Sequence, residues 1–256
     1  MKLLRVNVKK IEKVAKDIYR LNFTFPYIAK RSLPGHFLHV RIIHTILRRP
    51  FSINKVEGND VFILFKVRGK GTHILSGYKK GSSLDILGPL GRPFTIERNT
   101  FPILVAGGMG IAPLLYLAQK LNRFRKKGYT GWLFFGVKKK NELILRSEFV
   151  KLGFRIFVAT QDGSVGFKGM VTELLERKLK SSQIQALPRI YACGPKDMIY
   201  NLGEILKKYP SVEGEASWEQ FMGCGLGICL GCVIATKRGY KRVCTEGPVF
   251  NIKDVF

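Results

Sequence analysis

Short hydrophobic runs separated by turn-forming residues recur through the first hundred positions of the chain. The clearest are residues 38–42 (Leu-His-Val-Arg-Ile) and residues 61–67 (Val-Phe-Ile-Leu-Phe-Lys-Val), and glycine or Asn-Asp turn signals bound them. Further turns are expected at Gly81 and at residues 88–91. Short strands at this spacing predict a small antiparallel β-barrel, which we assign to residues 1–98.

The pattern changes near residue 99, where longer apolar runs alternate with segments of helical spacing. Residues 101–106 form a continuous apolar run, which is typical of a strand buried on both faces of a parallel sheet. The other expected strands are 131–136, 155–159 and 189–193, and the helix-like segments are 114–127 and 171–180. This alternation predicts a doubly wound α/β domain over residues 99–212, within an α+β multidomain fold.

Residues 213–256 are rich in glycine and cysteine and are expected to form a third, small unit. Its four cysteines, in the spacing C-x4-C-x2-C-x11-C, are Cys224, Cys229, Cys232 and Cys244. This plant-type spacing holds a [2Fe–2S] cluster on four thiolates. The intervening glycines let the backbone approach a cluster and direct N–H groups at its sulfurs. A structural zinc site is the alternative, but such sites usually contain two paired knuckles, and only Cys229 and Cys232 form one here.

A glycine turn follows the apolar run at 101–106 and comprises Gly107, Gly108, Met109 and Gly110. Such a turn lets the pyrophosphate of a dinucleotide approach the N-terminus of the next helix. Cys193, Gly194 and Pro195 end a later strand. Because ligands bind at the carboxyl ends of parallel strands, the two loops are expected to face one crevice. The alternatives are a purely structural turn and a cysteine that is only a small buried hydrophobe.

The barrel half contains two candidate phosphate-binding segments, Arg49-Pro50-Phe51-Ser52 and Gly69-Lys70-Gly71-Thr72. An arginine can neutralise a phosphate, and a loop of glycine and threonine can donate hydrogen bonds to one. Taken without context, the first segment is equally an ordinary entry into a strand.

The composition adds a strong positive charge, with 44 Lys and Arg against 18 Asp and Glu and a net charge of +26. Nucleic-acid binding is the first interpretation of such a charge. However, the basic residues are spread over the whole chain without an aromatic-and-basic motif, so we expect solvated faces and no nucleic-acid site. No membrane span is expected, because glycines interrupt the uncharged stretches at 101–118 and 221–236. A cytoplasmic location is the default expectation.

In this order, the motifs resemble those of the ferredoxin reductase superfamily. The resemblance is closest to the electron-transfer subunits of dihydroorotate dehydrogenase B, and it covers essentially the whole chain. Its most specific parts are the four-cysteine loop and the segment Glu246-Gly247-Pro248-Val249-Phe250. One departure precedes the cysteines, where Glu219-Gln220-Phe221 replaces the usual Glu-Glu-Arg.

The resemblance implies three redox groups and the residues that bind them. FAD would contact Arg49, Pro50, Phe51, Ser52, Lys66, Val67, Arg68, Gly71 and Thr72. NAD would contact Gly107, Gly108, Met109, Gly110, Cys193, Gly194 and Pro195. The four cysteines would hold the [2Fe–2S] cluster. NADP stays open as the nucleotide, because the three lysines at 138–140 could reach a 2′-phosphate.

The resemblance also implies an oxidoreductase subunit of pyrimidine biosynthesis. Its partner would be an FMN-containing dihydroorotate dehydrogenase catalytic subunit, in a heterotetramer of two of each, and electrons would pass through the cluster and FAD to NAD⁺. No acid–base catalytic residue is expected in this chain. Two other functions stay open: an NAD(P)H-oxidising subunit of a hydrogenase or ferredoxin-dependent oxidoreductase, and a zinc-binding basic interaction protein. The basic loop at 237–242 is either a docking segment for an acidic partner or a solvated hairpin.

Overall fold

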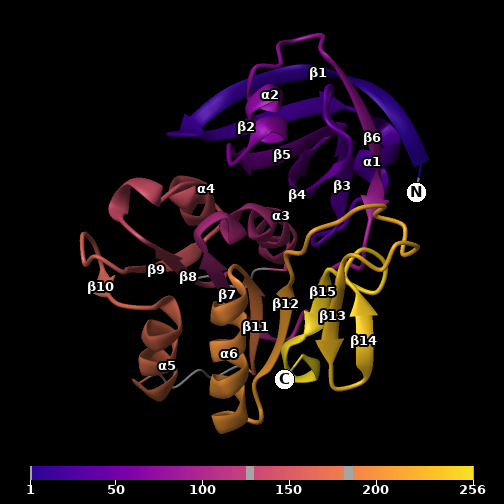
Figure 1. The fold of residues 1–256 in the computed structure, drawn as a ribbon. Helices are drawn as coiled ribbons and strands as arrows, with labels where there is room; N and C mark the ends of the chain where they lie inside the picture. The colour runs from indigo at the N-terminus through magenta and orange to yellow at the C-terminus, as the bar shows by residue number, and fades with distance from the viewer. Residues whose placement is uncertain (1, 125–129, 182–186, 256) are drawn as a thin grey trace.

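The first six strands of the chain close into an antiparallel barrel, at the top of Figure 1. The computed structural model describes residues 2–124, 130–181 and 187–255. The barrel strands are β1 (Lys2–Ala15), β2 (Ile18–Thr24), β3 (Phe37–Arg41), β4 (Arg49–Glu57), β5 (Asp60–Lys66) and β6 (Ser83–Leu90), closed in the order β1-β2-β5-β4-β3-β6. Two short helices accompany them, α1 (Pro26–Arg31) and α2 (Lys70–Ser76). Inward-facing side chains such as Leu21, Val40 and Ile63 are fully buried, as the short hydrophobic runs predict.

A seven-stranded sheet follows the barrel, with the order β10-β9-β8-β7-β11-β12-β15. Its strands are β7 (Phe101–Gly107), β8 (Gly131–Val137), β9 (Phe154–Thr160), β10 (Phe167–Lys168), β11 (Pro188–Cys193), β12 (Glu213–Ser217) and β15 (Val249–Asn251). All neighbouring strands are parallel except β15, which runs antiparallel to β12.

Helices cover both faces of this sheet. They are α3 (Ile111–Asn122), α4 (Arg146–Lys151), α5 (Val171–Ser181) and α6 (Lys196–Lys208), with the short turns η1 (Gly108–Gly110), η2 (Lys140–Glu142) and η3 (Ile252–Asp254). In β7, Ile103 packs with α5 and α6, whereas the next residue, Leu104, packs with α3 and α4. Successive side chains of a strand point to opposite faces, so the continuous apolar run fills both layers of a doubly wound sheet.

The cysteine-rich segment is joined to the large sheet at both of its ends. The hairpin β13 (Val233–Thr236) and β14 (Gly239–Arg242) follows the cysteine loop, but β12 and β15 are strands of the seven-stranded sheet. The sheet therefore continues past residue 212, where the sequence pattern places the end of the second unit. Cys232 and Cys244 lie in the same buried cluster as Phe37 of the barrel and Ile103 of the sheet, so the segment packs against both.

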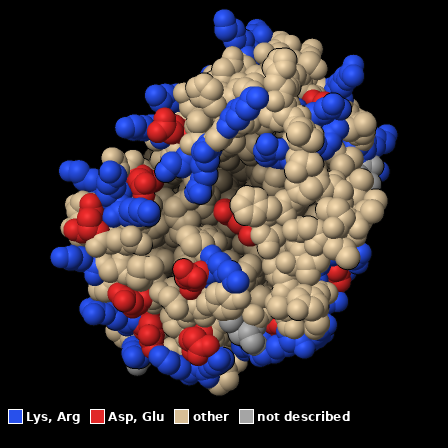
Figure 2. Space-filling view, viewed as in Figure 1, with Lys and Arg blue, Asp and Glu red and all other residues tan. Residues whose placement is uncertain are grey.

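The expected strands and helices all have counterparts in the structure, with small shifts at their ends. The helix expected at 114–127 begins earlier, at Ile111, and its expected last residues, 125–127, lie outside the described residues. Within the described ranges no helix has the length and apolar character to cross a membrane. Lys and Arg side chains lie in many separate places along the upper, left and lower parts of the face in Figure 2, whereas the part to the right of its centre shows few of them.

Candidate functional site

Two adjoining cavities lie where the barrel meets the sheet, and the face in Figure 2 is hollowed near its centre. One has a volume of about 860 Å³ and the other about 520 Å³. Four residues line both cavities: Lys66, Arg68, Met109 and Glu219. Ligands in the two cavities would therefore touch the same side chains. Two bound ligands would lie close enough there to react with each other directly.

The smaller cavity collects most of the residues predicted to bind FAD. Seven of the nine line it: Arg49, Pro50, Phe51, Ser52, Lys66, Arg68 and Thr72. The other two do not: Val67 donates its backbone N–H to Asp17, and Gly71 is buried against the Arg49 side chain. Residues 217–222 close the opposite wall. Two guanidinium groups, three hydroxyls and aromatic side chains such as Phe51 and Trp218 suit a ligand with phosphates and a flat apolar ring system.

The larger cavity lies at the carboxyl ends of the parallel strands. Of the residues predicted to bind NAD, five line it: Gly107, Gly108, Met109, Gly194 and Pro195. The turn after β7 and the turn after β11 touch, because a Cβ at Gly110 would overlap the backbone carbonyl of Cys193. The structure thus brings the two predicted loops to one crevice, as expected for an open α/β sheet.

Gly110 and Cys193 do not line this crevice but pack beneath the residues that do. Both residues are buried, and Cys193 is only 2% exposed. Burial raises the pKa of the Cys193 thiol well above its usual value, and the nearby Glu219 raises it further. This cysteine therefore stays protonated and packs as a small apolar side chain, the alternative that the sequence left open.

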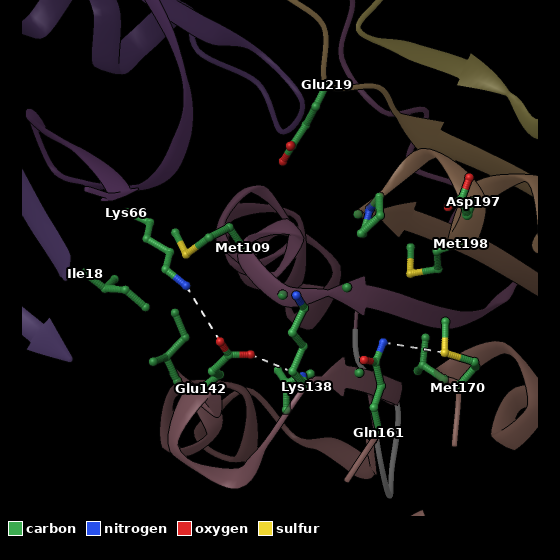
Figure 3. Close-up of a pocket in the computed structure, with 18 of the residues that line it drawn as sticks. Ile18, Lys66, Met109, Lys138, Glu142, Gln161, Met170, Asp197, Met198 and Glu219 are labelled. Atoms are coloured by element: carbon green, nitrogen blue, oxygen red, sulfur yellow. Dashed lines mark hydrogen bonds and ion pairs between the residues drawn. The ribbon is translucent and has the colours of Figure 1, made fainter. Parts of the chain in front are cut away.

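Several residues of the larger cavity carried no recognisable motif in the sequence, and Figure 3 shows how they lie. Glu142 accepts a hydrogen bond from the backbone N–H of Lys138 at 3.2 Å and faces the Lys66 ammonium at 3.7 Å. Gln161 donates to the sulfur of Met170 at 3.6 Å. Lys138, already noted as one of the three lysines at 138–140, directly follows β8, and Gln161 directly follows β9, so for Gln161 the position at a strand end was the available signal.

Glu219 enters the space between the two cavities from the segment after β12 (Figure 3). The surrounding cavity walls raise the pKa of its carboxyl group by desolvation, and the positive charge of Arg68 opposes this shift. The side chain is exposed to the cavity itself. A bound ligand at the junction would thus meet a carboxyl group that ionises less readily than an ordinary glutamate.

The four cysteines lie in two pairs, in the chain segment that follows the wall of the smaller cavity. Cys224 lies next to Cys229, and Cys232 lies next to Cys244. The Cys224 sulfur accepts backbone N–H bonds from Leu226 at 3.3 Å and Cys229 at 3.5 Å, and Cys232 accepts one from Cys244 at 3.4 Å. Although burial acts to raise it, these N–H groups lower the pKa of the Cys224 thiol to about 6. Thiolates held by backbone amides are the usual ligands of iron–sulfur clusters.

The paired arrangement of the four thiols fits a two-iron cluster. Two thiolates for each of two irons is the ligand set of a [2Fe–2S] cluster. Added Cβ atoms at Gly223 and Gly231 would lie 3.3 and 3.6 Å from the Cys229 sulfur, so the backbone passes closely beside this ligand. Cys229 is exposed, whereas Cys232 and Cys244 are buried, so one end of the site faces outward.

The barrel, the doubly wound sheet and the adjoining cavities define a flavoprotein of the ferredoxin reductase type, extended by an iron–sulfur segment. Residues 219–256 match the iron-sulfur cluster binding domain of dihydroorotate dehydrogenase B, and residues 104–202 match the oxidoreductase NAD-binding domain. The chain belongs to the family of dihydroorotate dehydrogenase B electron transfer subunits. The subunit from Desulforamulus reducens is 37% identical, over 97% of this chain and 96% of its own. That from Caldanaerobacter subterraneus is 38% identical, over 98% of each.

Solved structures agree with this assignment. The NADH-dependent reduced ferredoxin-NADP oxidoreductase, described in work on flavin-based electron bifurcation, superposes with a TM-score of 0.86 and is 28% identical, over 98% of this chain and 89% of that chain. The ferredoxin-NADP⁺ reductase of Plasmodium falciparum shares the fold, with a TM-score of 0.68 and 17% identity over 84% of this chain and 96% of that chain. The chain is thus an oxidoreductase subunit, and the predicted FAD, [2Fe–2S] cluster and nicotinamide nucleotide are the redox groups of its family.

Proposed function

We propose that this chain passes electrons from a dihydroorotate dehydrogenase catalytic subunit to NAD⁺. The relatives that span the whole chain are named as NAD(+)-linked electron transfer subunits of that enzyme, which supports both the acceptor and the partner. Bound FAD converts between the hydride that nicotinamide takes and the single electrons that an iron–sulfur cluster carries. In this function the chain itself binds, aligns and shields the three groups.

Each cavity supplies one part of this alignment. We assign Arg49 to the FAD pyrophosphate and Phe51 and Ser52 to its ring system, and Thr72 holds the loop beside it through hydrogen bonds from the backbone N–H groups of Arg68 and Gly69. The turn at Gly107 and Gly108, with the Gly194–Pro195 turn opposite, receives the nicotinamide nucleotide. Cys224, Cys229, Cys232 and Cys244 hold the cluster.

The observation that carries this proposal is the continuity of the three sites. Lys66, Arg68, Met109 and Glu219 line both cavities, so the flavin and the nucleotide meet there. The wall of the flavin cavity continues through Phe221 and Met222 directly into Gly223 and Cys224. A single chain segment therefore leads from the junction of the cavities to the first cluster ligand.

Purified protein, isolated without oxygen and reconstituted with FAD, tests the proposal. We expect a flavin spectrum, iron and acid-labile sulfide in equal amounts, and reduction of an artificial acceptor by NADH. Oxidation of dihydroorotate is expected only after the catalytic subunit is added. Zinc in place of iron, or no acceptor reduction by the flavin-loaded chain, would contradict the proposal.

We further propose that the catalytic subunit docks over the cluster end of the molecule. The cluster loop exposes Ile228 at 77% and Leu230 at 61%, and the loop between β3 and β4 exposes Ile46 at 97%. The two loops converge near His39, which contacts Gly225 and whose carbonyl accepts from Arg48. Exposed apolar side chains on both sides of the outward-facing Cys229, with a further one on the neighbouring loop, suit a protein partner that exchanges electrons with the cluster. The partner is expected to carry FMN in a heterotetramer of two of each subunit, in the cytoplasm.

The basic loop at 237–242 is a weaker docking candidate than this apolar surface. Arg238 pairs with Asp254 at 3.7 Å, and Lys241 and Arg242 pair with Glu246 at 3.0 and 2.9 Å. Three of its four basic side chains therefore have an acidic partner within the chain, two of them sharing Glu246. Ile46→Glu should reduce co-purification with the catalytic subunit and leave NADH–acceptor activity intact, whereas Val150→Glu, 60% exposed on α4, should change neither. Undiminished association of the Ile46 variant would exclude this surface.

A further inference from the structure

His39 is a buried polar residue between the flavin-binding strand and the cluster loop. It lies in β3, opposite Pro50 of β4 and Leu87 of β6, and its relative exposure is 0%. Pro50 lines the flavin cavity. On its other side, the imidazole contacts Gly225, the residue that follows the first cluster cysteine. His39 thus joins the walls of two redox sites.

Both ring nitrogens of His39 lack a hydrogen-bond partner among the described residues. Burial is the main cause that lowers the pKa of this imidazole to about 4, and the charge of Arg48 lowers it in the same direction. In either protonation state the imidazole carries at least one N–H donor. A buried donor left unpaired costs about 1–3 kcal/mol, so a leucine would serve better at this position if it only filled space.

The imidazole is directed at the start of the cluster loop. A Cβ at Gly225 would lie 2.6 Å from Nδ1 of His39, so only glycine allows this approach without a shift of the ring or the loop. Gly225 also has a positive φ of 70°, which glycine adopts without strain. The backbone carbonyl of Cys224 is close enough to favour the protonated ring. An N–H donor at this position faces the peptide groups next to the Cys224 ligand.

We propose that His39 is a positioning residue for electron transfer: with the cluster bound, its buried N–H group, which is unpaired among the described residues here, donates to the Cys224 end of the cluster loop, holds it against the flavin-binding strand and raises the reduction potential of the cluster. Hydrogen bonds around the sulfurs and ligands of an iron–sulfur cluster stabilise its reduced, more negative state. The same contact fixes the loop relative to Pro50, and hence relative to the flavin. This inference rests on the proposed function, because it requires a cluster on the four cysteines.

The holoprotein with His39→Leu and His39→Gln variants tests this role. Leucine fills the space without an N–H group, whereas glutamine restores a donor. We expect the leucine variant to show a lower cluster potential in an EPR-monitored redox titration and an altered EPR signal of the reduced cluster. The glutamine variant should return both toward the values of the unaltered protein. Tyr116→Phe, which removes a buried hydrogen bond outside the cluster loop, should lower stability without either change.

Two results would overturn the inference. One is a leucine variant whose cluster potential and EPR signal equal those of the unaltered protein. The other is a glutamine variant whose cluster potential shifts as far as that of the leucine variant, because His39 would then act through its shape and not through its N–H group. If the leucine variant loses its iron, restored iron content and potential in the glutamine variant support the donor role, and loss in both contradicts it. An unaltered protein without a cluster would instead reject the proposed function itself.

Discussion

Glu142 places a carboxylate inside the larger cavity, beside two of the lysines that line it. Its two oxygens face Lys66 Nζ at 3.7 Å and the backbone N–H of Lys138 at 3.2 Å (Figure 3). The side chains of the Lys66–Glu142 pair are 35% and 29% exposed, so the pair adds little to stability. The Glu142 carboxylate has a larger effect on ligand binding than on stability, because it repels any additional negative charge that enters this part of the cavity.

Glu142→Gln should therefore relax the discrimination against NADP. The amide keeps an oxygen that can accept from Lys138, and removal of the charge leaves Lys66 and Lys138 free to attract a 2′-phosphate. We expect the ratio of kcat/KM for NADPH to that for NADH to rise about tenfold, because a carboxylate near a phosphate costs of the order of 1 kcal/mol or more. Steady-state kinetics with an artificial acceptor measure the ratio. Glu57→Gln, outside the cavities, is the matched control, and an unchanged ratio in the Glu142 variant would exclude this role.

At this scale, residues with a signature in neighbouring positions could be predicted from the sequence. The cysteine ligands follow a local spacing, and Arg49 and Gly107 belong to short motifs at strand ends. Glu142 and His39 belong to no such motif, and Glu219 stood out only as part of the stretch before the cysteines that departs from the usual Glu-Glu-Arg. Their importance arises only when separate segments meet, as when β3 and the cluster loop bring His39 against Gly225.

Among the elements, the turn between β7 and α3 is the most tightly constrained. A Cβ at Gly110 would overlap the carbonyl of Cys193 and lie 2.8 Å from the backbone nitrogen of Gly194. Backbone atoms cannot move aside as a flexible side chain can. Gly108, two positions earlier, has open space around it and a φ of 52°. The two glycines thus serve different needs, close packing of two loops and a left-handed backbone.

Gly110→Ala should destabilise the protein far more than Gly108→Ala. The first substitution forces the β7 and β11 turns apart, which we expect to cost about 3 kcal/mol or more. The second adds only the penalty of a left-handed alanine, about 1–2 kcal/mol. Chemical denaturation monitored by circular dichroism compares the two free energies of unfolding. Equal losses would show that the contact with Cys193 is not the constraint at Gly110.

The longer strands and helices could be predicted from the spacing of their hydrophobic residues, and the shortest ones could not. The run at 101–106 is apolar on both faces and became the central strand β7. By contrast, β15 contains only Val249–Asn251, too short for a period to be recognised. Its pairing with Ser217 and Glu215 of β12, more than thirty positions earlier, is a tertiary contact that local sequence does not encode. The continuation of the sheet past residue 212 was missed for this reason.

For the whole molecule, the decisive feature is how firmly the barrel is joined to the sheet. The Tyr116 hydroxyl of α3 donates to the buried carbonyl of Ser32 in the barrel half at 2.8 Å. The Asn54 amide of β4 donates to the carbonyl of Ala112 in α3, also at 2.8 Å. Buried polar groups at an interface fix one relative position, because any displacement would leave them unpaired. The two cavities depend on this fixed position, since both are lined from each side.

We therefore expect barrel and sheet to unfold together, and Tyr116→Phe to weaken the whole protein and not one part of it. The variant leaves the Ser32 carbonyl buried without its donor, at a cost of about 1–2 kcal/mol. Flavin release, circular dichroism and calorimetry should report one shared transition, shifted to lower temperature. Tyr240→Phe, with a side chain 79% exposed on the hairpin, should leave the transition unchanged. Separate transitions for flavin release and sheet melting would mean that the interface couples the two halves less than these buried hydrogen bonds imply, and that the alignment of the cavities depends on the bound ligands themselves.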